Sequence, residues 1–110
     1  MKARLSAAGY ADEQLHVVVP PDRPKDGNLV AVLPGSDPKL KPLLLLAHID
    51  VVEANRADWE RDPFKLVEED GFFYARGSSD DKAMAAVFAD SMVRFKQESY
   101  SAEAHASSSR

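Results

Sequence analysis

His48 and Asp50 stand at the end of an apolar run, LLLLAHIDVV, that extends from Leu43 to Val52. Side chains two residues apart point to the same side of an extended strand, so this imidazole and this carboxylate can face one site where the strand ends. A neutral imidazole is a good zinc ligand, and a nearby carboxylate can fix its ring or handle a proton from metal-bound water. The same spacing also fits a partly buried histidine satisfied by a neighbouring aspartate, so both interpretations stay open.

A second candidate segment is ARGSSDDKA, from Ala75 to Ala83. Gly77 permits a close backbone approach, and Asp80 or Asp81 stands where the next helix is expected to begin. A carboxylate at that position can cap the helix or hold a metal ion, and the segment alone does not separate these roles. A phosphate-binding P-loop is excluded, because that pattern needs a glycine directly before Lys82.

The elements that must position these residues follow from the hydrophobic pattern. The run PLLLLAHID lacks alternation, which predicts a central strand with both faces covered and His48 at its carboxyl end. In open α/β sheets that edge is where ligands bind. From Asp80 to about Gln97 the spacing changes to that of an amphipathic helix, with a buried stripe of Met84, Val87, Phe88, Met92 and Phe95.

The other expected elements are shorter. KARLSAAGY predicts a helix stopped by Gly9, LHVVVP and NLVAVLPG predict two strands, and the sequence around Asp70-Gly71 predicts a tight hairpin. Together these elements predict an α/β fold, a partial three-layer sheet with flanking helices.

Composition narrows the class of protein. The chain has 110 residues, 45% of them apolar and 29% charged, which is the balance of a globular domain, or part of one. Its net charge of −4 offers no basic field, so we expect neither nucleic acid nor a membrane surface as partner. It has no cysteine, which leaves His, Asp and Glu as the strong metal ligands available. No targeting signal is visible and the compartment stays undetermined.

These segments occur in an order and at a spacing that resemble the M20 family of zinc metallopeptidases. The resemblance rests on LLLLAHIDVVEANRADWERDPF followed by EEDGFFYARGSSDDKA, and it covers nearly everything from Leu5 to Tyr100. It implies that residues 1–100 form the N-terminal part of an M20-like catalytic domain. Residues 101–110 do not match and are expected to be a disordered tail.

The resemblance also implies roles for three residues. His48 is similar to the first zinc ligand, Asp50 to the catalytic carboxylate that orients it, and Asp80 to the carboxylate that bridges two zinc ions. Asp81 lies at a variable position, and the family's glycine after Lys82 is Ala83 here.

For an intact enzyme the resemblance implies zinc-dependent hydrolysis of amide bonds in peptides or N-acyl amino acids, with two Zn²⁺ ions and a possible homodimer formed through a separate domain. The general-base glutamate and later ligands are not matched, so we expect these residues to be inactive alone. A non-catalytic binding module and one part of a split enzyme are the alternatives.

Four further residues receive ordinary interpretations. Glu103 and His105 are read as tail residues, because no hydrophobic strand presents them. His16 is expected on the solvent face of a strand, and Trp59 as an anchor that packs its loop onto the body.

Overall fold

The computed structural model describes residues 1–101 and 106–109. Helix α1 (Lys2–Ala7) ends as expected at Gly9, which has a φ of 101°. The amides of Gly9 and Tyr10 donate to the carbonyls of Ser6 and Leu5, which satisfies the last turn of the helix. The single turn η1 (Asp12–Gln14) then leads into the sheet.

The main sheet has four strands in the order β1-β2-β6-β3. Strands β1 (Leu15–Val18) and β2 (Asn28–Leu33) are antiparallel, as the two β-branched runs predict. Strand β3 (Leu43–Leu46) is parallel to β6 (Ala106–Ser109), which is antiparallel to β2. The strand predicted before His48 is therefore present, but it lies at an edge of the described sheet and not at its centre.

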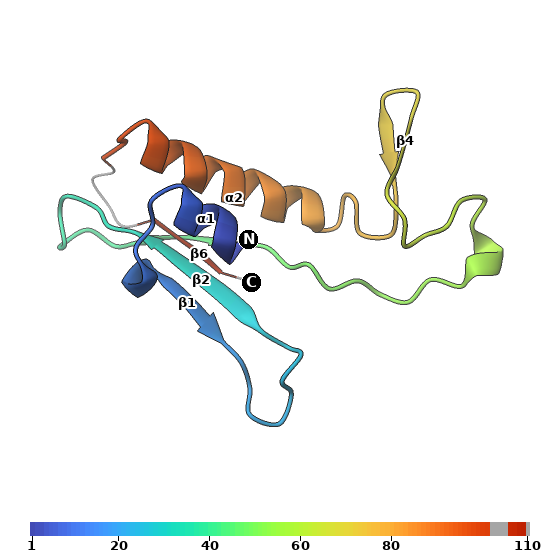
Figure 1. The fold of residues 1–110 in the computed structure, drawn as a ribbon, viewed down its shortest axis with the longest axis horizontal. Coiled ribbons are helices and arrows are strands. Elements are labelled where there is room, and N and C mark those ends of the chain that lie inside the picture. The colour runs from blue at the N-terminus through green and yellow to red at the C-terminus, as the bar shows by residue number, and fades with distance from the viewer. Residues whose placement is uncertain (102–105, 110) are drawn as a thin grey trace.

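Both helices pack on one face of the sheet, as Figure 1 shows for α1 and α2 (Lys82–Gln97). Arg4 of α1 and Asp90 of α2 form an ion pair of 2.6 Å between the helices. The core between helices and sheet consists of Leu5, Tyr10, Leu15, Ala31, Leu33, Met92 and Val93. The α/β class is thus confirmed, with helices on one face of the sheet in the part of the chain described.

Only part of the predicted stripe of α2 is buried. Met92 is fully buried, and Phe88 and Phe95 are half-buried, whereas Met84 and Val87 are exposed. The reason is that the C-terminal half of α2 packs over the sheet and α1, while its N-terminal half extends toward the hairpin (Figure 1).

The expectation that both faces of β3 are covered is wrong for the part of the chain that the structure describes. Leu43, Leu44 and Leu46 are 54–61% exposed. The described helices pack on β1 and β2 through the core cluster, whereas in β3 only Leu45 is half-buried.

The end of the chain also differs from the expectation of a disordered tail. Residues 106–109 form β6, which fills the space between β2 and β3. Its backbone hydrogen bonds pair groups that these two strands would otherwise leave unmatched, and such pairing does not require apolar side chains. Glu103 and His105 lie outside the described residues.

The predicted hairpin stands apart from the main sheet (Figure 1). Strands β4 (Val67–Glu69) and β5 (Phe72–Tyr74) are antiparallel and are joined by Asp70 and Gly71, both with positive φ. The segment after β3 runs out to this hairpin through the short turn η2 (Arg56–Asp58). The radius of gyration, 16.6 Å, exceeds the roughly 13 Å of a compact domain of this length.

Among the described helices, none has the length and apolar character needed to cross a bilayer.

Candidate functional site

His48 lies in the extended segment that follows β3, where the sequence placed it. Its backbone amide donates to Oδ2 of Asp81 over 3.3 Å. This bond joins the end of the leucine strand to the start of α2, two regions that are 33 residues apart in the sequence. The two candidate segments of the sequence therefore meet at His48.

The imidazole of His48 lies between two carboxylates. Its Nδ1 is 3.2 Å from the backbone oxygen of Asp50 and 3.3 Å from Oδ1 of the same residue. Its Nε2 is 3.3 Å from Oδ1 of Asp80. The structure thus brings together all three residues that the sequence singled out.

These contacts set the electrostatics of the ring. The hydrogen bond to the Asp50 backbone oxygen, followed by the negative charges of Asp50, Asp80 and Asp81, raises the pKa of His48 above its ordinary value. In the neutral ring, the bond to Asp50 assigns the proton to Nδ1 and leaves the lone pair of Nε2 facing Asp80. Two acceptors that face each other repel, so this arrangement favours a proton or a cation between them.

Gly77 allows the loop before α2 to lie close to the segment that follows β3. Its φ is 78°, and a Cβ at this position would lie 2.3 Å from Cγ1 of Val51. The hydroxyl of Ser78 donates to the Ala75 carbonyl, which closes the turn. The close approach expected of Gly77 is therefore confirmed.

The capping interpretation of the two aspartates receives no support. Asp81 occupies the N-cap position of α2 but makes no side-chain capping bond, and its carboxylate binds the His48 amide instead. Asp80 directs Oδ1 at the His48 ring, and the peptide bond between Asp80 and Asp81 is cis.

An open pocket of about 270 Å³ surrounds these groups. His48, Asp50 and Asp80 line it on one side, and Trp59 and Arg76 also line it. Its volume is close to the lower limit of about 300 Å³ for small-molecule sites. Trp59 therefore borders the site.

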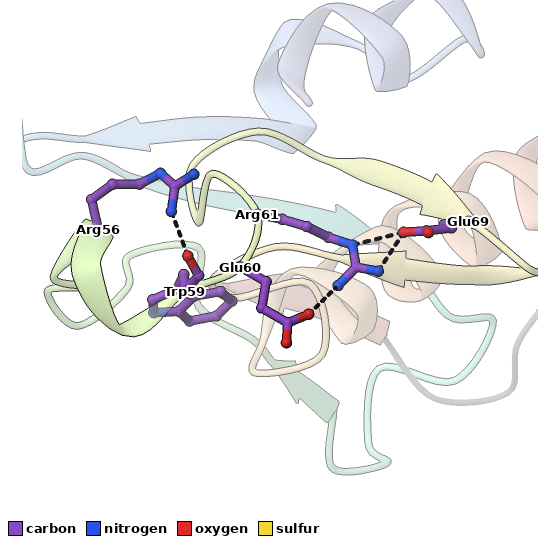
Figure 2. A network of polar contacts seen from close by, with 5 residues as sticks. All are labelled: Arg56, Trp59, Glu60, Arg61 and Glu69. Carbon is purple, nitrogen blue, oxygen red and sulfur yellow. Dashed lines mark hydrogen bonds and ion pairs between the residues drawn. The ribbon is translucent and has the colours of Figure 1, made fainter.

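A polar network fixes the loop that carries Trp59 (Figure 2). Arg56 donates to the Trp59 carbonyl, and Arg61 pairs with Glu69 of β4 and, at 3.5 Å, with Glu60. The Arg61 guanidinium also lies 4.2 Å from the centre of the Tyr74 ring. The Arg61 contacts tie the loop to the hairpin. In this network Trp59 takes part through its backbone, so the anchoring role expected of its side chain stays a prediction.

The pair formed by His48 and Asp80 fits a zinc ion by distance and by donor type. Two donors that bind one zinc ion at about 2.0–2.1 Å in tetrahedral geometry lie about 3.3–3.4 Å apart. The observed separation of Nε2 and Oδ1 is 3.3 Å. No group of three or more His, Cys, Asp or Glu side chains in residues 1–101 and 106–109 is arranged to hold a metal ion, so these residues supply part of a ligand set.

Sequence reasoning missed two residues of the site. Asp81 was considered only as a possible helix cap or metal ligand, although its carboxylate binds the His48 backbone amide, and Arg76 was not singled out, although it lines the pocket. Both lie in the segment ARGSSDDKA, but their contacts depend on long-range packing. His16, in contrast, is exposed on β1 as expected.

Comparison with known proteins identifies the family. Residues 44–105 match the family model described as peptidase family M20/M25/M40, and the chain belongs to this family. The match includes the strand end, the hairpin and the loop before α2, and it continues past Tyr100, where the resemblance was expected to stop.

Particular relatives include two kinds of acyl-amino-acid enzyme. The human protein named N-fatty-acyl-amino acid synthase/hydrolase PM20D1 is 56% identical over 48 residues, which is 44% of this chain and 10% of that protein. Mouse aminoacylase-1 is 36% identical over 103 residues, which is 91% of this chain and 24% of that protein. The chain thus spans about a tenth to a quarter of the length of these relatives.

Solved structures of dipeptidases share the fold. Human carnosine dipeptidase 1 aligns with a TM-score of 0.70 and 26% identity, over 97% of this chain and 23% of that one. The dipeptidase Dug1p from Saccharomyces cerevisiae aligns with a TM-score of 0.67 and 26% identity, over 98% of this chain and 24% of that one.

Proposed function

We propose that the chain supplies the first part of the zinc site of an M20-family hydrolase, which cleaves amide bonds in peptides or N-acyl amino acids. The observation that carries this proposal is the position of His48, whose Nε2 faces the Asp80 carboxylate over 3.3 Å while Nδ1 is held by Asp50. Family membership and the names of the relatives support the type of substrate.

Each of the three residues would have a separate task. His48 would bind zinc through Nε2, and Asp80 would bind it through a carboxylate oxygen and be available to bridge to a second ion. Asp50 would hold the ring in the tautomer that leaves Nε2 free, as carboxylates beside ligating histidines do. When bound, zinc supplies a water of lowered pKa and polarises the scissile carbonyl.

The pocket would orient the amide beside these ligands. Trp59 forms an apolar wall of the pocket, and Arg76 is a cation in its lining. The remaining ligands and the general base would come from outside the described residues, so we expect no hydrolysis by these residues alone.

Hydrolysis should be measured with the longest natural polypeptide that contains this chain, using N-acetyl amino acids and dipeptides. We expect activity that a chelator abolishes and zinc restores. His48→Ala and Asp80→Asn should each abolish it, whereas Asp50→Asn should lower zinc affinity or activity about 10- to 100-fold.

The matched control is His16→Ala, because His16 is an exposed histidine on β1 and does not line the pocket. Equal losses in the His16 and His48 variants, or hydrolysis unaffected by chelation, would refute the proposal.

A further inference from the structure

Asp81 differs from the two other aspartates at the site in what it contacts. The side chains of Asp50 and Asp80 are 90% and 91% exposed and lie against the His48 ring, whereas Asp81 is half-buried. Its Oδ2 accepts a hydrogen bond from the backbone amide of His48 over 3.3 Å. Asp81 therefore holds the backbone that carries the ring, and it does not belong to the described lining of the pocket.

The amide of His48 lies beyond the hydrogen-bond ladder of the sheet. Strand β3 pairs with β6 only from Leu43 to Leu46, and residues 47–55 are in neither helix nor strand. An amide in such a segment takes its acceptor from water or from another part of the chain, and a carboxylate binds it more strongly than a neutral oxygen does. The bond to Asp81 therefore anchors the segment at the point where the ring of His48 begins.

The turn before α2 contacts His48 twice, because Asp80 and Asp81 are consecutive. Oδ1 of Asp80 lies 3.3 Å from Nε2 of the ring, and Oδ2 of Asp81 lies 3.3 Å from the backbone nitrogen. The carbonyl of Asp81 also accepts from the amide of Ala85 over 3.0 Å, which joins this turn to the first turn of α2. Movement of the His48 backbone relative to α2 would therefore change the separation of Nε2 and the Asp80 carboxylate.

We propose that Asp81 is a positioning residue of the zinc site, which holds the backbone of His48 so that Nε2 and the Asp80 carboxylate stay at the separation that one zinc ion needs. Ligands that are held in place before the ion arrives lose little conformational freedom on binding, which raises the affinity for the metal. The inference rests on the proposed function, because it takes His48 and Asp80 as zinc ligands.

Two substitutions separate the hydrogen bond of Asp81 from its charge. Asp81→Ala removes both, whereas Asp81→Asn removes the charge and keeps a side-chain oxygen that can accept from the His48 amide. In the longest natural polypeptide that contains the chain, Asp81→Ala should raise the dissociation constant for zinc about 10- to 100-fold, and Asp81→Asn should retain most of the affinity. At saturating zinc, KM for N-acetyl-leucine should stay unchanged in both variants, because Asp81 does not line the described pocket.

Asp37→Ala is the matched control. Asp37 is also half-buried, and its Oδ1 accepts from the backbone amide of Lys39 over 2.8 Å, in a turn before β3. Its loss should leave the dissociation constant for zinc unchanged. Equal losses of affinity in Asp81→Ala and Asp81→Asn would show that Asp81 acts through its charge, and equal losses in Asp81→Ala and Asp37→Ala would show a general structural effect; either result overturns the assignment.

A second readout uses the zinc-free 110-residue chain. Hydrogen exchange of the His48 backbone amide, followed by NMR, should be slower in the unaltered chain and in Asp81→Asn than in Asp81→Ala. Equal exchange in the unaltered chain and in Asp81→Ala overturns the assignment. Slower exchange in the unaltered chain, together with no zinc binding by the longest natural polypeptide, refutes the proposed function instead.

Discussion

At the scale of single residues, the site depends on how one histidine ring is held. Asp50 contacts Nδ1 through its backbone and its carboxylate, and Asp80 contacts Nε2. Asp81 accepts a hydrogen bond from the His48 backbone amide. Asp50 therefore sets the tautomer of the ring, all three aspartates favour its charged form, and Asp81 fixes the backbone position of His48.

The first prediction concerns the charge of this ring. The Asp50 backbone bond and then the surrounding carboxylates raise the pKa of His48, and Asp80 is one of those carboxylates. In the metal-free protein we expect Asp80→Asn to lower the pKa of His48, because it removes a negative charge that favours the imidazolium. An NMR titration of the ring protons measures the change.

Asp70→Asn provides the control, since Asp70 lies in the hairpin turn and asparagine tolerates its positive φ. A pKa that stays unchanged in Asp80→Asn would show that the two side chains do not interact in solution.

At the scale of elements, two glycines with similar backbone angles permit a comparison. Gly77 and Gly71 have φ values of 78° and 79°, but only Gly77 would bring a Cβ against another side chain, Val51. Gly71→Ala should lower the free energy of unfolding by about 1–2 kcal/mol through backbone strain. Gly77→Ala should cost more and should also weaken zinc binding, because the loop before α2 must move.

Chemical denaturation and zinc titration of both variants provide the measurement. Equal losses of stability, with zinc binding preserved in both, would show that the close approach of the loop to Val51 does not position the site.

Helix α2 permits a second comparison, between two methionines. Met92 is fully buried against the sheet, and Met84 is 44% exposed. Met92→Ala should lower the free energy of unfolding by about 2–5 kcal/mol, because it removes packing and leaves a cavity. Met84→Ala should change it by less than about 0.5 kcal/mol.

Urea unfolding of Met92→Ala and Met84→Ala measures both changes in the free energy of unfolding. A similar loss in both would mean that the N-terminal half of α2 is packed as tightly as its C-terminal half.

Local pattern predicted most elements. Gly9, the β-branched runs and Asp70-Gly71 predicted the helix end, two strands and the hairpin, because these signals act within a few residues. The environment of β3 and the strand β6 were not predicted, because each depends on what lies beside it in the fold.

The site likewise has residues that local pattern predicts and residues whose roles depend on neighbours in the fold. His48, Asp50 and Asp80 could be proposed from motif and resemblance, and the structure brings them together. The roles of Asp81 and Arg76 could not be proposed from the sequence. They arise from contacts with His48 and Trp59 that no local pattern encodes.

At the scale of the whole molecule, β3 presents an uncovered apolar surface. Leu44 and Leu46 lie on one face of the strand and are 54% and 61% exposed. Exposed apolar surface of this kind favours association, so we expect the 110-residue chain to self-associate as its concentration rises. Sedimentation velocity should show the increase, and replacing both leucines by lysine should reduce it.

Arg94→Gln changes a polar residue far from β3 along the chain and is a suitable control. A chain that stays monomeric at every concentration would show that β3 is covered in solution.

The central claim concerns the zinc site of the complete polypeptide, since these residues span only part of the relatives' length. The most direct test is the zinc content of the longest natural polypeptide that contains this chain, measured for the unaltered protein, His48→Ala and His16→Ala. We expect the unaltered protein and His16→Ala to retain zinc equally and His48→Ala to lose it. Full zinc retention in His48→Ala would contradict the account.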